Sequence, residues 1–120
     1  MKKQAWKKKV IAACEEVGTY RPAFNSVIDT LSEILERRDE ANEVFLKTGG
    51  SVIVTHTNKG GNKNLEQHPA LRLAADLNRD ALAYWRDLGL TPAGLKKLNA
   101  EVVKDESTGS FEKLLSRLNE

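Results

Sequence analysis

The chain has 120 residues with 30% charged and 40% hydrophobic side chains, which is typical of one globular domain and excludes a disordered chain. No apolar run approaches the roughly 18 to 20 residues that cross a bilayer, and the lysine-rich start lacks the features of a signal peptide, so we expect a cytoplasmic protein without a membrane partner. Cys14 is the single cysteine, so an internal disulfide is excluded. Together with only two histidines, it does not provide the spacing of a metal-binding site. We therefore expect a buried Cys14 and no cofactor.

The net charge is only +2, but it is unevenly distributed. Residues 1–22 carry six basic and two acidic side chains, a local charge of +4, whereas residues 23–48 carry three basic and six acidic ones, a local charge of −3. The basic cluster has two open interpretations, contact with nucleic-acid phosphates or a solvated, fraying terminus. Its members are Lys2, Lys3, Lys7, Lys8 and Lys9.

Two helices are predicted in the first half of the chain. Apolar residues recur at three- and four-residue steps from Trp6 to Val17, and Gly18 is a natural stop. A longer helix is predicted from Pro22, which suits its first turn, to about Thr48, where two glycines end it.

An acidic line follows the polar face of this second helix. Its residues recur at alternating steps of four and three, which places them on one side of a helix. They either form a solvated face or meet basic residues of a neighbouring helix or chain. The line consists of Asp29, Glu33, Glu36, Glu40 and Glu43.

A β-hairpin is predicted next. Residues 51–57 are β-branched and bounded by glycine, residues 63–67 form a second short run, and the segment between them supplies turn residues. Because an isolated two-stranded hairpin is marginal in water, we expect it to be pinned to the helices or to a neighbouring chain. Lys59 and Lys63 at its tip are further candidates for nucleic-acid contact.

A third helix is predicted from Pro69 to about Leu88. Its apolar residues cover an arc of roughly 200° on a helical wheel, about twice the stripe that faces one core, so one partner helix cannot bury all of them. Beside the arc lies a ridge of three arginines whose seven-residue spacing matches the acidic line. We expect this ridge to face acids of a neighbouring helix or chain, with nucleic-acid phosphate as the rival partner, and we expect Trp85 to lie in the subunit interface. The ridge consists of Arg72, Arg79 and Arg86.

The C-terminal part contains two shorter segments. A fourth helix is predicted to begin at the Thr91-Pro92 cap and to run through Leu95 and Leu98. After a polar spacer, a final amphipathic segment is too short to be a stable helix alone, so we expect it to dock on a partner. Its apolar residues are Phe111, Leu114, Leu115 and Leu118.

No enzyme is predicted. A nucleophile-and-base arrangement needs a suitably oriented histidine, but His56 falls in a predicted strand and His68 precedes a helix-starting proline. Gly60-Gly61 lacks the remainder of a P-loop and is better explained as a hairpin turn. A small hydrolase therefore has little support.

The predicted fold class is mainly α with a small β-hairpin: a long helical hairpin with an inserted β-hairpin, oligomerising side by side. We divide the chain into a helical oligomerisation and recognition domain, residues 1–100, and a tail, residues 101–120. The excess apolar arc and the complementary charged lines both favour association between copies. A repeated head-to-tail contact closes a ring, whereas a self-complementary contact stops at a dimer, and both remain open here.

The order of these elements resembles one family of phage terminase small subunits. The similarity covers about residues 20–98: a long helix ending in glycine, a hairpin, His68-Pro69-Ala70-Leu71, a helix, and then Leu88-Gly89-Leu90-Thr91-Pro92-Ala93. The family often has an arginine soon after the Thr-Pro pair, whereas here Gly94, Leu95 and Lys96 follow. Lys96 and Lys97 are possible substitutes for that basic position.

The resemblance implies a ring-like homo-oligomer in the host cytoplasm that recognises viral double-stranded DNA. It would deliver the DNA to a separate large subunit, whose ATPase and nuclease activities it regulates. We expect DNA contact chiefly through backbone phosphates, from the basic N-terminal helix, the hairpin tip or the ring surface. We also expect the segment from Phe111 to Leu118 to be a candidate dock for the large subunit. The alternative is a helical protein-interaction adaptor with no nucleic-acid role.

Overall fold

The computed structural model describes residues 1–101, which form a mainly helical fold with one inserted hairpin. This confirms the predicted fold class, although association between copies is not shown by a single chain. Among these residues no helix is both long enough and apolar enough to cross a membrane. In chain order the elements are α1 (Lys3–Val17), a 3-10 turn (Pro22–Phe24), α2 (Asn25–Lys47), β1 (Ile53–Thr57), β2 (Lys63–Gln67) and α3 (Pro69–Asp87), followed by a helix over residues 92–101.

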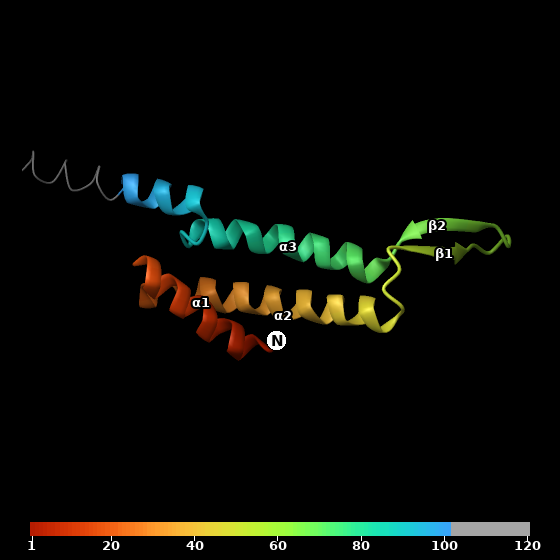
Figure 1. The fold of residues 1–120 in the computed structure, drawn as a ribbon, viewed down its shortest axis with the longest axis horizontal. Coiled ribbons are helices and arrows are strands. Elements are labelled where there is room, and N and C mark those ends of the chain that lie inside the picture. Colours follow the sequence, from red (N-terminus) through yellow and green to blue (C-terminus); the bar gives the residue numbers. More distant parts are fainter. Residues whose placement is uncertain (102–120) are drawn as a thin grey trace, which may run out of the picture.

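The helices α2 and α3 lie antiparallel along their lengths, and α1 folds back along the first half of α2 (Figure 1). The hairpin connects the far ends of α2 and α3 and projects beyond them (Figure 1). Its strands pair antiparallel, from Ile53 opposite Gln67 to Thr57 opposite Lys63. The molecule therefore has a thick end, where three helices meet, and a thin end, which carries the hairpin.

The hydrophobic core lies at the thick end. It is built from α1, α2 and α3 together, and half-buried aromatic residues, including Tyr84 and Trp85, pack around it. Burying each large apolar side chain contributes roughly 1.5–3 kcal/mol, so this cluster holds the three helices together. Cys14 is 0% exposed, as predicted. The fully or nearly fully buried members are Val10, Cys14, Ile28, Leu31, Leu35, Ala81 and Leu88.

Three predicted boundaries were wrong. Helix α1 begins at Lys3 rather than Trp6, because the polar first turn is held by α2: the Lys3 amide donates to the Glu36 carboxylate. Helix α2 begins at Asn25, because Pro22 opens a separate 3-10 turn instead of the first α-helical turn. Strand β1 covers only Ile53–Thr57, two residues shorter than predicted at its start.

The fourth predicted helix is confirmed and is closely packed. The Thr91 hydroxyl accepts a hydrogen bond from the Gly94 amide at 3.0 Å, which is the expected N-cap contact. Gly89, before this helix, has a φ of 73°, and a Cβ there would lie 2.9 Å from Leu98 and 3.0 Å from Thr19. Glycine is thus required at this turn both by backbone conformation and by space. The predicted segment from Phe111 to Leu118 lies outside the described residues.

Candidate interaction surfaces

The N-terminal lysines and the acidic line of α2, which were assigned separate roles, partly meet each other. The Lys3 and Lys7 amino groups lie 3.0 and 3.6 Å from the Asp29 carboxylate. The hydrogen bond to Asp29 raises the pKa of Lys3, and the same hydrogen bond lowers the pKa of Asp29. Two of the five candidate lysines therefore already have an acidic partner in their own chain.

The other lysines of this cluster point to solvent. Lys2, Lys8 and Lys9 are exposed, and the Lys9 amino group lies 5.2 Å from the centre of the Trp6 ring. Such a cation–π contact restrains the side chain without neutralising its charge. Among residues 1–101, these three lysines form no ion pair, so we assign contact with an anionic partner to them first.

Asp39, which was absent from the predicted site residues, organises the start of α1. Its carboxylate accepts a 2.7 Å hydrogen bond from the Trp6 indole and lies 3.1 Å from the Arg38 guanidinium. Burial acts to raise the pKa of Asp39, but hydrogen bonds from the terminal amino group, Trp6 and Arg38 outweigh it, so the pKa is lowered. In the sequence, Asp39 is a carboxylate just off the acidic line. Nothing in that position reveals that α1 packs beside it.

The acidic line divides into two sets. Asp29 and Glu36 are half-buried and contact α1, as described above. Glu33 and Glu43 pair with basic residues one turn further along α2, at 2.7 and 2.8 Å, and Glu40 is exposed. Glu40 and Glu43 are exposed, whereas Glu33 is half-buried like Asp29 and Glu36.

The arginine ridge lies on the side of α3 that faces away from the core. Arg72, Arg79 and Arg86 are exposed, whereas Ala74 and Ala81 on the other side are buried against α2. Among residues 1–101, the ridge has a single ion pair, from Arg79 to the neighbouring Asp76 at 3.6 Å. The ridge therefore does not meet the acidic line within one chain.

The wide apolar arc of α3 is buried along its middle and exposed at both edges. Ala74, Ala81 and Leu88 are buried, but Leu73 is 53% exposed on one edge and Leu82 is 46% exposed on the other. The half-buried Trp85, predicted at an interface between copies, packs against the core of its own chain. The structure thus agrees with the prediction that one partner helix cannot cover this arc.

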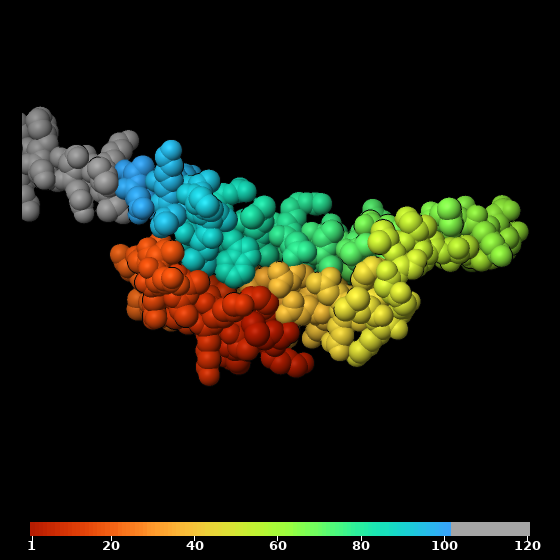
Figure 2. All heavy atoms as spheres, viewed as in Figure 1, coloured from red at the N-terminus to blue at the C-terminus, as the bar shows by residue number. Residues whose placement is uncertain are grey.

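The hairpin is covered by no second layer among the described residues. It stands apart from the helical body in the space-filling view (Figure 2). By its register, Ile53, Thr55 and Thr57 share one face with Gln67, Leu65 and Lys63. On that face Ile53 is 53% and Leu65 is 77% exposed, and Lys63 lies toward the tip.

His68 clamps the base of the hairpin. Its Nδ1 accepts a hydrogen bond from the Ala70 amide at 3.1 Å, so the imidazole caps α3. Its Nε2 lies 2.6 Å from the Thr48 hydroxyl after α2, and its amide donates to the Val52 carbonyl at 2.8 Å. The ring edge also packs on Phe45, with the centroids 5.2 Å apart. His68 therefore links the end of α2, the base of the hairpin and the start of α3, and both of its ring nitrogens take part in these contacts.

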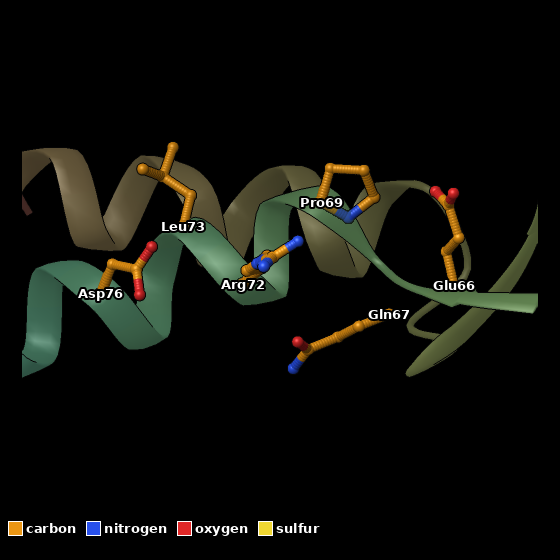
Figure 3. Close-up of a pocket in the computed structure, with 6 residues that line it drawn as sticks. All are labelled: Glu66, Gln67, Pro69, Arg72, Leu73 and Asp76. Atoms are coloured by element: carbon orange, nitrogen blue, oxygen red, sulfur yellow. The ribbon is translucent and has the colours of Figure 1, made fainter.

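A hollow of about 460 Å³ lies where the hairpin meets α3 (Figure 3). Glu66 and Gln67 come from β2, while Pro69, Arg72, Leu73 and Asp76 come from α3 (Figure 3). Its wall combines a basic, two acidic and two apolar side chains, a mixture that suits a polar protein contact. Within residues 1–101 no group of His, Cys, Asp and Glu side chains is placed to hold a metal ion.

The candidate nucleic-acid contacts form two separate groups. The α1 lysines lie beside the first half of α2, whereas Lys59 and Lys63 lie on the hairpin at the opposite end of the molecule (Figure 1). One chain does not bring them together on one surface. A single nucleic-acid segment would touch both only by running along the molecule or by crossing between copies.

Comparison with known proteins gives one match. Residues 3–105 match the family model described as "Phage terminase, small subunit". No curated protein and no solved structure matches the chain.

Proposed function

We propose that this chain, which belongs to the family of phage terminase small subunits, assembles into a homo-oligomeric ring that recognises viral DNA for packaging. The family is non-catalytic and works with DNA and a terminase large subunit. In this proposal the large subunit carries the ATPase and the nuclease, and the ring regulates them.

The observation that supports assembly is the uncovered apolar surface on α3 and the hairpin. Leu73, Leu82, Ile53 and Leu65 are each about half exposed or more. Burying apolar area contributes about 25 cal/mol per Å², and an isolated hairpin is marginal in water. Contact with a neighbouring copy would cover both features at once.

The charges favour a head-to-tail arrangement of copies. The arginine ridge is on the outer side of α3, and the exposed acids Glu40 and Glu43, with the half-buried Glu33, are on α2, so one chain offers two complementary surfaces. A contact between two different surfaces repeats from copy to copy and closes into a ring when the rotation permits it. Asp29 and Glu36 contact α1, and Glu33 and Glu43 pair with Arg37 and Lys47 of their own helix, so a neighbouring arginine would compete with these partners. Trp85 would contribute to the interface from its half-buried position.

DNA recognition is assigned to the exposed lysines. Lys2 just before α1, Lys8 and Lys9 on α1, and Lys59 and Lys63 near the hairpin tip would contact backbone phosphates. Lys3 and Lys7 belong to the same predicted group, but phosphate would have to compete with Asp29 for them. Repetition around a ring would multiply these few contacts, which suits a chain with a net charge of only +2.

The DNA proposal is tested with the triple variant Lys2→Gln, Lys8→Gln, Lys9→Gln. Each phosphate contact contributes about 0.9 to the slope of log affinity against log salt concentration, so we expect weaker DNA binding and a flatter salt dependence. The measurement is a titration of duplex DNA at several salt concentrations. Lys47→Gln is the control, because Lys47 is exposed on α2 and pairs with Glu43.

An unchanged affinity and salt slope in the triple variant would remove α1 from the DNA-binding surface. If the unmodified protein itself shows no DNA binding that increases with duplex length, the adaptor alternative is favoured instead. The segment from Phe111 to Leu118 remains the proposed dock for the large subunit. Co-sedimentation of the full chain with the large subunit, with and without Leu114→Asp, tests that assignment.

A further inference from the structure

The hairpin is the most one-sidedly charged part of the molecule, and the proposed function uses only its two lysines. From Val52 to Leu65 the chain has no acidic residue, and Lys59 and Lys63 give this short stretch a charge of +2, as much as the whole chain. The nearest acid in the sequence is Glu66, which lies at the base of β2 beside α3. A protruding surface with this charge suits a polyanion such as duplex DNA.

The hairpin tip is ordered by its own hydrogen bonds. The Asn58 side-chain oxygen accepts from the Gly60 and Asn62 amides, each at 3.0 Å. The Asn58 amide donates to the Asn62 carbonyl at 2.9 Å, and Gly61 closes the turn with a φ of 82°. Since His68 fixes the other end of the hairpin, little conformational freedom is left to be lost when a partner binds.

The two faces of the hairpin differ in chemistry. Side chains alternate between the faces along each strand, and directly opposite residues share a face. One face carries the exposed Ile53 and Leu65, which the proposed assembly would cover. On the other face His56 lies directly opposite Asn64, and both are exposed, with Glu66 nearer the base. The face that is left uncovered by the assembly thus presents an imidazole and a carboxamide side by side.

These side chains have the chemistry that distinguishes base pairs. The major groove of DNA, about 12 Å wide, admits a two-stranded antiparallel ribbon, and the hairpin stands apart from the helical body (Figure 2). The carboxamide of Asn64 both donates and accepts, which matches N6 and N7 of adenine, and the imidazole of His56 can donate to N7 of a purine. Glu66 would remain outside the groove, because it lies at the base of the hairpin.

We propose that the hairpin enters the major groove of duplex DNA and reads base edges through His56 and Asn64. Lys59 and Lys63 contact the phosphates that flank the groove at this site. The inference rests on the proposed function, since it names the part of the chain that gives DNA binding its sequence preference. The lysines of α1 contribute affinity but no preference, because phosphate contacts carry no sequence information directly.

Selection from a pool of short duplexes with a randomised centre tests this reading. The full chain should enrich a base pattern, and His56→Ala with Asn64→Ala should flatten it. We expect the double variant to bind the best selected duplex roughly tenfold more weakly, while its affinity for the unselected pool changes little because the phosphate contacts remain. The control is Thr55→Ala with Thr57→Ala, since both threonines lie on the other face of β1. A pattern that survives in the His56 and Asn64 variant, or that is lost equally in the control, would overturn the proposal.

Replacing the purines of the selected duplex with 7-deaza analogues tests the groove. Loss of N7 removes an acceptor that is accessible only in the major groove. The analogue should weaken binding of the unmodified chain but not of the variant that lacks the His56 and Asn64 side chains. Equal binding of the two duplexes by the unmodified chain would contradict entry into the major groove.

A change of preference is a readout that a misfolded hairpin cannot imitate. Asn64→Arg should shift the preferred base at one position of the pattern from adenine to guanine, because arginine pairs with O6 and N7 of guanine. A hairpin that fails to fold can lose a pattern, but it cannot acquire a new one. An unaltered pattern in this variant would contradict base contact by Asn64.

The same selection separates this inference from the proposed function. Duplex binding without any base pattern would overturn the reading by the hairpin and leave DNA binding by the lysines in place. Absence of duplex binding would overturn both.

Discussion

His68 shows how one side chain can determine where a whole element lies. The sequence indicated only that His68 precedes a helix-starting proline. In the structure its imidazole caps α3, bonds Thr48 after α2 and packs on Phe45. The Thr48 hydroxyl donates to the Val44 carbonyl at 2.8 Å, so its oxygen is left to accept a hydrogen bond from His68. Nδ1 already accepts from the Ala70 amide, which fits a neutral imidazole with its proton on Nε2. The direction of the hairpin is thus set at its base.

Replacing His68 with alanine should loosen the hairpin more than the helices. Loss of an N-cap costs about 0.5–2 kcal/mol, and the contact to Thr48 is lost with it. We expect a lower melting temperature and faster hydrogen exchange at residues 52–57 and 63–70, with the α1 core little changed. The control is His56→Ala, because His56 is exposed in β1. Equal exchange in the two variants would show that His68 is not the clamp.

Residue burial was easier to predict than residue pairing. Cys14 was correctly expected inside, because a lone cysteine in an amphipathic helix behaves as a small apolar residue. The pair between Lys3 and Asp29 was missed, since the two lie in different helices and meet only after the chain reverses near Gly18. Periodicity places a side chain on a face of its own helix, but it does not say which helix lies opposite.

At the scale of elements, the sequence predicted every α-helix and both strands within residues 1–101, but not the 3-10 turn at Pro22–Phe24. Those predictions were based on apolar periodicity, on glycines that end helices, and on the two helix-starting residues Pro69 and Pro92. The errors were at starts of elements. Lys3 joins α1 through contacts with α2, and Pro22 forms a 3-10 turn, neither of which follows from a local pattern.

Gly94 gives a sharp test of how the last described helix packs. A Cβ at this position would clash with the backbone carbonyl of Arg86, which cannot move as a flexible side chain could. Gly94→Ala should therefore push residues 92–101 away from α3 and destabilise the fold by about 1–3 kcal/mol. Chemical denaturation measures the effect. Gly60→Ala is the control, because a Cβ there meets only the Asn58 side chain at 3.5 Å; a similar small effect for both variants would mean that the close approach is absent.

At the scale of the whole molecule, the main question is what covers α3 and the hairpin. The sequence revealed an apolar arc too wide for one partner, and the structure leaves its two edges exposed at Leu73 and Leu82. Neither the number of copies nor their rotation follows from one chain, because both depend on the fit between surfaces. In the proposed assembly, the outer side of α3 would meet the outer side of α2 of the next copy.

A double variant addresses this surface directly. Leu73→Asp with Leu82→Asp places charges on both exposed edges of the arc while leaving the buried Ala74 and Ala81 in place. We expect a folded protein, by circular dichroism, that no longer assembles. The control is Leu46→Asp, because Leu46 is equally apolar and 70% exposed but lies on α2 away from the arc. Assembly that survives the double variant would place the interface elsewhere.

Sedimentation velocity of the unmodified chain over a wide concentration range tests the central claim most directly. We expect one discrete species containing several copies, with a mass that is a fixed multiple of 13.4 kDa and persists on dilution. A well-folded protein that sediments as a single copy even at high concentration would contradict the account, because its exposed leucines would then need no neighbour.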